Sequence, residues 1–273
     1  MRLLCCGSGD PILFIHGIPT SNRLWDGIIR RLSERFTCYT LDLPGLGSEP
    51  RMTCGLGELR RIVEEVELLR VKAGMERWNV VGHDAGSAIA VVYAHVFAER
   101  VKRLALMSPA LFPDIRPYYL FRLLRKPIVG ELLAPCVHPL IWRVAMRRAC
   151  RGRDADWQLA LAAFEMPFRG PLGPWHMMRV LRWGKPSEVL GEMPDLLPAL
   201  RPRTIIFHGA NDPAIPVSFA YRAAALIPNS KLAIVDAGHF VPLNCPEVIS
   251  HGLDLFFNGE KPDLNGVLAK EKK

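Results

Sequence analysis

The stretch Val80-Val81-Gly82-His83-Asp84-Ala85-Gly86-Ser87 joins a short apolar run to a longer helical pattern. A strand that turns sharply into a helix brings the two backbones close together, so small residues are needed two positions before and after the middle of the turn. That middle residue is Asp84. The N–H groups at the start of the following helix favour a carboxylate at this point and keep it ionised.

Short apolar runs alternate with helical patterns on both sides of this turn. This alternation is typical of βαβ units around a mainly parallel sheet. Each run ends in a polar or glycine-containing turn, and open α/β sheets build their sites at such strand ends. The predicted strands are residues 2–6, 12–15, 37–41, 78–81, 101–107, 204–207 and 231–235.

A long segment, residues 112–200, interrupts this pattern. It is rich in Leu, Arg, Trp and Pro and contains no period-2 alternation, so we expect several short helices. The predicted division is an α/β core of residues 1–111 and 201–260, a helical lid of residues 112–200, and a polar tail of residues 261–273. The predicted helix breaks are at Pro127, Pro135, Pro139, Pro167, Pro171, Pro174 and Pro186.

The turn Gly82-His83-Asp84-Ala85-Gly86 resembles the elbow of one branch of the α/β-hydrolases, which comprises haloalkane dehalogenases, haloacetate dehalogenases and epoxide hydrolases. That branch uses aspartate where lipases and esterases use serine. Two further motifs resemble the same branch, namely His16-Gly17-Ile18-Pro19-Thr20-Ser21 and Asp42-Leu43-Pro44-Gly45-Leu46-Gly47-Ser48. The resemblance covers everything outside residues 112–200 and implies an α/β-hydrolase fold.

The resemblance also supplies two partners for Asp84. Asp212 follows a predicted strand, where the family's acid lies, and His239 follows the last strand. The order of nucleophile, acid and histidine is that of the family. We therefore expect Asp84 as nucleophile, His239 as base and Asp212 as the acid that orients it.

These residue types suit a two-step hydrolysis. A carboxylate displaces a leaving group from saturated carbon, or opens a strained ring, and forms an alkyl ester. Water activated by His239 then cleaves that ester. The backbone N–H groups of Ile18 and Ala85 are the expected oxyanion hole for the charge that develops on Asp84.

The sequence constrains the choice of substrate less than it constrains the catalytic triad. Haloalkane dehalogenases carry halide donors where this chain has Ala85 and Ile18, so the resemblance supports the ester mechanism more strongly than dehalogenation. Epoxide hydrolases use lid tyrosines to protonate the ring oxygen. We expect a small hydrophobic substrate, with Phe112 and Met178 among the pocket walls. The predicted lid contacts are Tyr118, Tyr119, Trp142, Phe168, Trp175 and His176.

Three functions stay open. The first is hydrolysis of an epoxide or a similarly strained electrophile, and the second is dehalogenation of a haloalkane or haloacid. The third is a catalytically silent ligand-binding protein that retains the triad. Serine-type esterase activity is disfavoured because Ser87 lies beyond the apex of the elbow.

The composition and charge of the chain limit its possible partners, cofactors and cellular location. A formal charge of +8 is not concentrated in a basic tract interleaved with aromatics, so no nucleic-acid partner is expected. Residues 112–200 carry 13 basic and 8 acidic side chains, which permits an anionic substrate.

No transmembrane segment, secretory signal, metal-ligand spacing or cofactor is expected. The seven cysteines predict reduced, mostly buried thiols, with Cys5-Cys6 in a buried strand, and a cytoplasmic protein of undetermined oligomeric state.

Overall fold

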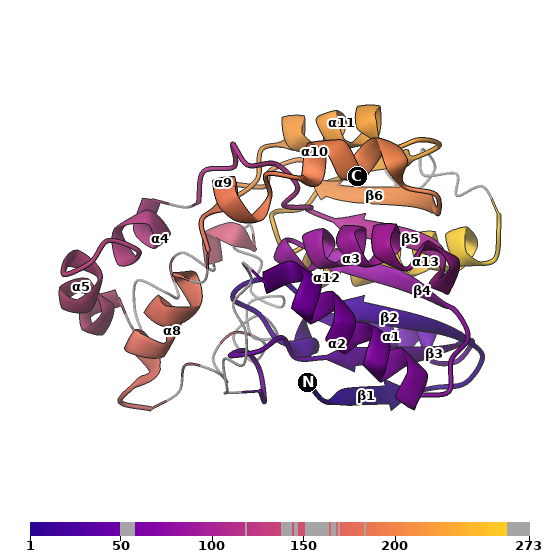
Figure 1. Ribbon diagram of the computed structural model, residues 1–273, viewed down its shortest axis with the longest axis horizontal. Coiled ribbons are helices and arrows are strands. Elements are labelled where there is room, and N and C mark those ends of the chain that lie inside the picture. The colour runs from indigo at the N-terminus through magenta and orange to yellow at the C-terminus, as the bar shows by residue number, and fades with distance from the viewer. Residues whose placement is uncertain are drawn as a thin grey trace, which may run out of the picture.

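The fold is seen in a computed structural model that describes residues 1–49, 58–117, 119–137, 144, 147–150, 164, 168, 170–182 and 184–260. In these parts of the chain one seven-stranded sheet has the order β1-β3-β2-β4-β5-β6-β7 (Figure 1). β1 is antiparallel to β3, and every other neighbouring pair is parallel. The predicted mainly parallel sheet is confirmed. The strands are β1 (Leu3–Cys6), β2 (Asp10–Ile15), β3 (Phe36–Leu41), β4 (Trp78–His83), β5 (Val101–Met107), β6 (Arg203–Gly209) and β7 (Lys231–Val235).

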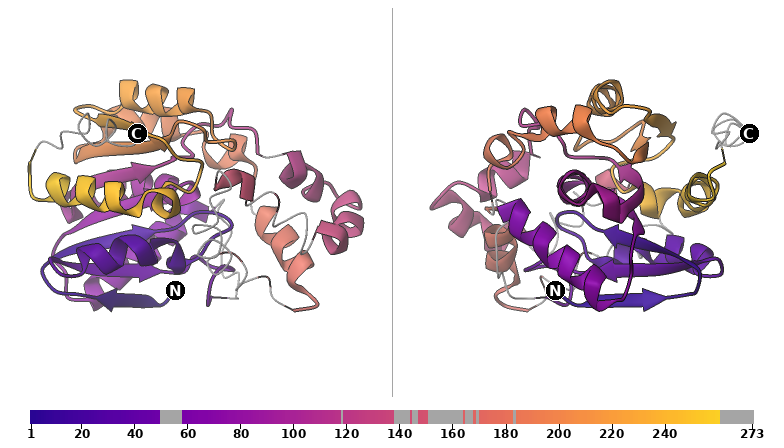
Figure 2. Two further views of the ribbon diagram at one scale, coloured as in Figure 1. Left: turned by 180° about the vertical axis from the view of Figure 1, so that it is seen from behind. Right: turned by 45° about the vertical axis from the view of Figure 1, so that its right-hand side comes forward.

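Helices cover both faces of the sheet. α2 and α3 pack together over one face, and α1 and α13 pack together over the other (Figures 1 and 2). These core helices and short turns are η1 (Asn22–Trp25), α1 (Asp26–Leu32), α2 (Leu59–Lys72), α3 (Ala85–Val96), η3 (Ala98–Arg100), α11 (Val217–Leu226), α12 (Val241–Asn244) and α13 (Pro246–Phe257).

The central strand β4 and the helix that follows it form the middle of the core. Every residue of β4 is buried, because a parallel strand between two helical layers has no solvent face. In α3 the residues from Gly86 to Ala94 are buried, and the small residues Ala88 and Ala90 have no solvent exposure. The elbow between β4 and α3 is therefore anchored by buried residues on both sides of it in the sequence.

The edge strand β1 corrects one prediction. Cys5 and Cys6 lie in a strand as expected, but both are exposed rather than buried. β1 pairs only with β3 and lies at the edge of the sheet, so the helical layers do not cover it. Cys136 is also exposed, whereas Cys38, Cys150 and Cys245 are buried. The prediction of mostly buried thiols is therefore wrong, since half of the described cysteines are exposed.

Helices alone connect β5 to β6 in the described part of residues 112–200, as predicted. α4, α5 and α8 contact one another and project beyond the sheet, whereas α10 contacts α3 (Figure 1). We call residues 112–200 the insertion. Its described helices are α4 (Tyr119–Leu124), α5 (Val129–Val137), α8 (Gly173–Leu181), α9 (Pro186–Val189), α10 (Met193–Leu196) and η5 (Leu197–Ala199).

The prolines of the insertion act in two ways. Pro174 and Pro186 occupy the first turns of α8 and α9, where a missing N–H costs no helical hydrogen bond. Pro135 lies inside α5, so the break predicted there is wrong. It falls in the last turn of this short helix, where few later residues depend on the lost bond. Pro139, Pro167 and residues 261–273 lie outside the described residues.

None of the described helices combines the length and the apolar character needed to cross a membrane.

Candidate active site

The elbow after β4 owes its sequence to close backbone contacts. Asp84 has φ 50° and ψ −121°, a conformation that L-residues rarely adopt. A Cβ atom on Gly86 would lie 2.3 Å from the Ile15 carbonyl oxygen and 2.5 Å from that of His16. A Cβ on Gly82 would lie 2.6 Å from the Gly86 carbonyl oxygen. Glycine is therefore required on both sides of Asp84.

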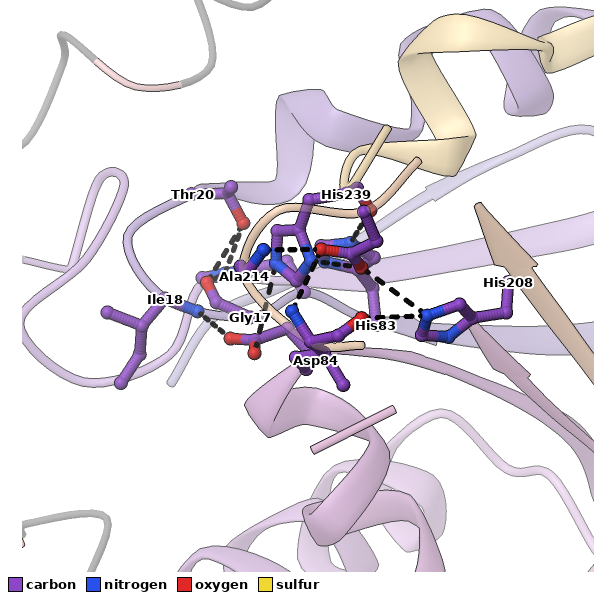
Figure 3. A network of polar contacts seen from close by, with 11 residues as sticks. Gly17, Ile18, Thr20, His83, Asp84, His208, Ala214 and His239 are labelled. Atoms are coloured by element: carbon purple, nitrogen blue, oxygen red, sulfur yellow. Dashed lines mark hydrogen bonds and ion pairs between the residues drawn. The ribbon is translucent and has the colours of Figure 1, made fainter. Parts of the chain in front are cut away.

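The Asp84 carboxylate lies against backbone donors. Ile18 N–H donates to Asp84 Oδ2 at 3.0 Å (Figure 3). The Ala85 N–H also donates to this carboxylate. Gly17 leaves room for it, since a Cβ there would lie 2.7 Å from Oδ2. The two N–H groups predicted as an oxyanion hole thus both donate to the Asp84 carboxylate.

His239 lies between two carboxylates. Its Nδ1 bonds Asp212 Oδ2 at 2.8 Å, and its Nε2 lies 3.9 Å from Asp84 Oδ1 (Figure 3). Asp212 is held in turn by the N–H groups of Ala214 and Ile215, which donate to its Oδ1 at 2.8 and 2.9 Å. The structure therefore brings the three predicted triad residues together, with one imidazole nitrogen directed to each acid.

Burial and charge shift the pKa of each group. Burial raises the pKa of Asp84, although His239 and the two backbone donors oppose that shift. Burial alone would raise the pKa of Asp212, but the charge and hydrogen bond of His239 hold it at about 2. Burial would lower the pKa of His239, yet Asp212 and Asp84 raise it above the ordinary value. Asp212 is thus ionised, and the protonation of His239 depends on the charges of Asp212 and Asp84.

Three further histidines support the site. His83 Nε2–H donates to the His239 carbonyl oxygen at 3.0 Å, and burial lowers the pKa of His83 to about 3, so it stays neutral. His208 Nε2 bonds the Ile215 carbonyl oxygen at 2.9 Å. Leu43 N–H donates to His16 Nε2 at 3.0 Å, which leaves His16 Nδ1–H to donate to Gly17. These rings fix the loops that carry the triad.

The insertion contacts the loop that carries His239. The His239 N–H donates to the Ala149 carbonyl oxygen at 2.9 Å, and Asn244 Nδ2 donates to the Cys150 carbonyl oxygen at 3.1 Å. Asn244 Oδ1 also accepts from Gly238 N–H at 3.1 Å. Two consecutive carbonyls of the insertion therefore help to position the histidine.

A cavity of about 200 Å³ lies between the triad and the insertion. Its described lining is almost entirely aliphatic, and its only ionisable side chains are Asp84, His239 and Arg125. The lining residues from the insertion include Ile115, Pro117, Phe121, Arg125, Ala149, Val180, Leu181, Gly184, Pro186, Val189 and Leu190. Within the described ranges no cluster of His, Cys, Asp and Glu is suited to hold a metal ion.

Most of the predicted lid contacts lie elsewhere. Tyr119 is 68% exposed and Trp175 is 38% exposed, and neither lines the cavity. His176 Nε2 bonds the Gly45 carbonyl oxygen at 2.7 Å, and buried Phe168 packs against the His176 ring. These four assignments are corrected: Tyr119 and Trp175 are exposed, His176 ties the insertion to a core loop, and Phe168 packs against His176.

The predicted pocket walls also need correction. Phe112 is buried, but its ring packs on Phe219 and beneath the Arg222 guanidinium, which lies 4.0 Å from the ring centroid. Met178 is buried and does not line the cavity. Tyr118 and Trp142 lie outside the described residues.

Sequence reasoning missed the residues that do line the cavity from the insertion. In α8, Val180 and Leu181 are buried while Trp175 and Arg179 are exposed. Helical periodicity would have placed Val180 and Leu181 on one apolar face. The prediction of Trp175 depends on its large aromatic side chain, but that side chain lies on the exposed face of α8.

The sheet order, the aspartate elbow and the histidine loop define an α/β hydrolase fold. A family model described as alpha/beta hydrolase fold matches residues 10–130. An uncharacterised protein of Mycobacterium tuberculosis is 30% identical over 256 residues, which is 86% of this chain and 71% of that protein. The chain therefore belongs to the α/β hydrolase fold family.

Other relatives match over shorter regions. A soluble epoxide hydrolase of Corynebacterium sp. is 33% identical over 108 residues, covering 40% of this chain and 37% of that protein. A haloalkane dehalogenase of Agrobacterium fabrum is 33% identical over 138 residues, covering 46% and 43%.

Solved structures agree on the fold. An α/β hydrolase fold protein of Burkholderia ambifaria has a TM-score of 0.81 at 22% identity, with 92% of each chain covered. A thermophilic esterase of Thermogutta terrifontis has a TM-score of 0.76 at 21% identity, with 94% of this chain and 93% of that one covered. Since esterases share the fold, the reaction has to be argued from the site.

Proposed function

We propose that this protein is a hydrolase that forms an alkyl ester on Asp84 and then hydrolyses it. One observation carries the proposal: the Ile18 N–H holds Asp84 Oδ2 and the Ala85 N–H also donates to this carboxylate, while Oδ1 lies 3.9 Å from His239 Nε2. That separation exceeds a hydrogen bond, so Oδ1 is left to attack and His239 Nε2 is left to bind water.

In the first step Asp84 Oδ1 bonds to an electrophilic carbon. The bond from that carbon to its leaving atom breaks, and the leaving atom takes the electron pair. A halide departs as the anion, whereas the oxygen of an opened epoxide takes a proton from water. Asp84 Oδ2 becomes the ester carbonyl oxygen and keeps its hydrogen bond from the Ile18 N–H, with the Ala85 N–H as the second donor to the same group. No proton is removed from Asp84 in this step, because an ionised carboxylate is already the nucleophile.

In the second step His239 acts as the base. Ester formation removes the negative charge of Asp84, which is one of the causes that raise the pKa of His239. The pKa of His239 therefore falls once the ester forms, and the neutral imidazole takes a proton from water. The hydroxide attacks the Asp84 carbonyl carbon, and Ile18 and Ala85 stabilise the oxyanion. Asp212 stabilises the imidazolium until the bond from the carbonyl carbon to the alkyl oxygen breaks. His239 then gives its proton to that oxygen, so the product leaves as an alcohol and the Asp84 carboxylate is restored.

An epoxide or similarly strained hydrophobic electrophile is the substrate class we favour. The aliphatic lining suits a hydrophobic molecule, and ring strain supplies part of the driving force for attack. The partial match to a soluble epoxide hydrolase supports this choice. Dehalogenation is the second candidate, supported by the partial match to a haloalkane dehalogenase. In both cases the insertion serves as the lid over the cavity.

Trapping the ester tests the mechanism. The His239→Gln variant should still be alkylated when incubated with a panel of terminal epoxides and haloalkanes. The peptide that contains Asp84 should gain the mass of the alkyl group, and diol or halide release by the wild type identifies the substrate class. His251→Gln is the matched control, because His251 is exposed on α13 and should turn over without an accumulated adduct.

Isotope labelling shows which result would contradict the ester mechanism. In a single wild-type turnover in heavy-oxygen water, the label should enter Asp84 before it enters product. Product labelled in that first turnover beside unlabelled Asp84 would mean direct attack by water. An unreactive wild type across the whole panel, with no adduct on His239→Gln, would favour a silent binding protein instead.

A further inference from the structure

Arg125 is a cation in an otherwise aliphatic part of the cavity. It follows α4 directly, and its N–H donates to the Phe121 carbonyl oxygen at 3.1 Å, which continues the helical turn. Phe121 and Arg125 are four residues apart, so they share one face of this turn, and both line the cavity. Tyr119 and Arg122 are three apart and both exposed, with the Arg122 guanidinium 5.8 Å from the Tyr119 ring centroid. Arg122 therefore lies away from the cavity.

Two carbonyl oxygens hold the Arg125 guanidinium. One of its terminal nitrogens donates to Leu181 and the other donates to Gly184, at 2.7 Å for the second bond. A guanidinium has five N–H donors, so three remain available. The side chain is thus fixed in direction by the end of α8 while most of its donors stay free to bind a ligand.

Arg125 has no ion-pair partner among the described residues. Burial lowers its pKa, and Glu188 is the acid whose charge opposes that shift. Glu188 is exposed and bonds Lys185 Nζ at 2.9 Å instead. Arginine cannot lose its proton in a protein, so within the described part of the chain this half-buried charge has no counter-ion. A cation of this kind is most stable when an anion reaches it.

We propose that Arg125 forms a carboxylate-binding subsite, so that the natural substrate carries a carboxylate on an apolar chain. A carboxylate matches the planar fork of a guanidinium and accepts two hydrogen bonds from it. Asp84 repels an anion, so the carboxylate is held on the lid side of the cavity and the apolar chain extends toward the triad. The inference rests on the proposed function only in taking this cavity as the substrate site.

Equilibrium binding of unreactive ligands tests the subsite without any chemistry at Asp84. Hexanoate and hexanamide have the same chain and shape, but only hexanoate is charged at pH 7.5. We expect calorimetry to show wild-type protein binding hexanoate about tenfold to hundredfold more tightly than hexanamide, as for a hydrogen bond between charged groups. Arg125→Met should lose that preference and keep its affinity for hexanamide.

Two further variants separate recognition from structural support. Arg122→Met removes the same charge three residues earlier, within α4, and it should bind both ligands as the wild type does. Arg125→Lys keeps the charge but loses the fork, and it should retain part of the preference for hexanoate. Retained hexanamide binding also shows that the cavity is intact in Arg125→Met.

Several results would overturn the subsite. These are equal wild-type affinity for the two ligands, equal weakening of both by Arg125→Met, or the same loss of preference in Arg122→Met. Because no reaction occurs, the outcome is independent of the trapping experiment. An absent ester with intact hexanoate selectivity would refute the proposed chemistry and leave the subsite standing.

Discussion

The strand-end loops and the insertion line the same cavity but are held by different forces. Asp212 is buried and accepts hydrogen bonds from two backbone N–H groups and from His239. In the insertion, Glu131 and Arg182 form an ion pair that is largely exposed, and Leu132 is exposed beside them on α5. Buried, hydrogen-bonded groups hold the reacting atoms in place, whereas this ion pair of the insertion is open to solvent. This difference predicts where substitutions are costly.

The largest effect is expected at the elbow. Asp84→Asn should lower kcat by about 10⁴-fold or more, because an amide is not a nucleophile. Since burial raises the pKa of Asp84, its ionised form destabilises the fold once the pH rises through that pKa. The neutral variant should therefore unfold at the same or a higher temperature at pH 7. Turnover within tenfold of wild type would remove Asp84 from the mechanism.

Glycine substitutions compare the two regions at the level of the backbone. Gly86→Ala should destabilise by about 3 kcal/mol or more, because its Cβ would overlap two carbonyl oxygens that cannot move aside. Gly191→Ala in the insertion meets Ser187 O only at 3.3 Å and should change stability by less than about 0.5 kcal/mol. Urea unfolding at equal m-value measures both. Similar losses would mean that the elbow has more freedom than its contacts suggest.

Acid unfolding compares the two carboxylates whose pKa lies at about 2, Asp212 and Glu131. A carboxylate with a lowered pKa stabilises the fold at pH values above its pKa in the unfolded state. This stabilisation is lost as the pH falls toward 2. The buried Asp212 should contribute about 2 kcal/mol between pH 4 and pH 2, and Asp212→Asn should abolish that part of the pH dependence. Glu131→Gln should remove a smaller contribution, one that added salt also removes because solvent screens the exposed pair.

The pH dependence of alkylation sharpens the assignment of charges. Attack requires ionised Asp84, so the rate in single turnover should fall on the acid side at a higher pH than for an ordinary aspartate. His239 lowers the pKa of Asp84, so the acid limb of adduct formation in His239→Gln should move to still higher pH. Stopped-flow or quenched mass measurements follow both limbs. A shift toward lower pH would contradict the ion pairing between these residues.

The smallest effect compares two aromatic residues of α4. Phe121→Ala should raise KM for an apolar substrate about fivefold, because Phe121 lines the cavity and loses roughly 1 kcal/mol of apolar contact. Tyr119→Ala should leave KM within about twofold, since Tyr119 faces solvent. An equal rise in both would place Tyr119 in contact with substrate, as its sequence position first suggested.

Sequence alone identified the sheet and the meeting of Asp84, Asp212 and His239, because steric and chemical requirements act on single positions there. Gly82 and Gly86 are dictated by carbonyl oxygens within 2.6 Å of where a Cβ would stand. No comparable constraint marks which side of a short helix faces a cavity. Trp175 and Tyr119 are large and can donate hydrogen bonds, yet tertiary packing turned them outward. In the sequence Arg125 resembles any surface arginine, and only the fold places it in the lining of the cavity.

The hydrogen bonds from the His239 loop to Ala149 and Cys150 bear on exchanging parts between related enzymes. A chimaera that replaces the whole insertion to import another specificity would also replace the two carbonyls that hold this loop. Such a graft would fail through misplacement of the imidazole, even with a well-formed pocket. Retaining residues 147–150 of the host at the junction, and exchanging only the flanking helices, keeps the loop anchored while the ligand preference changes.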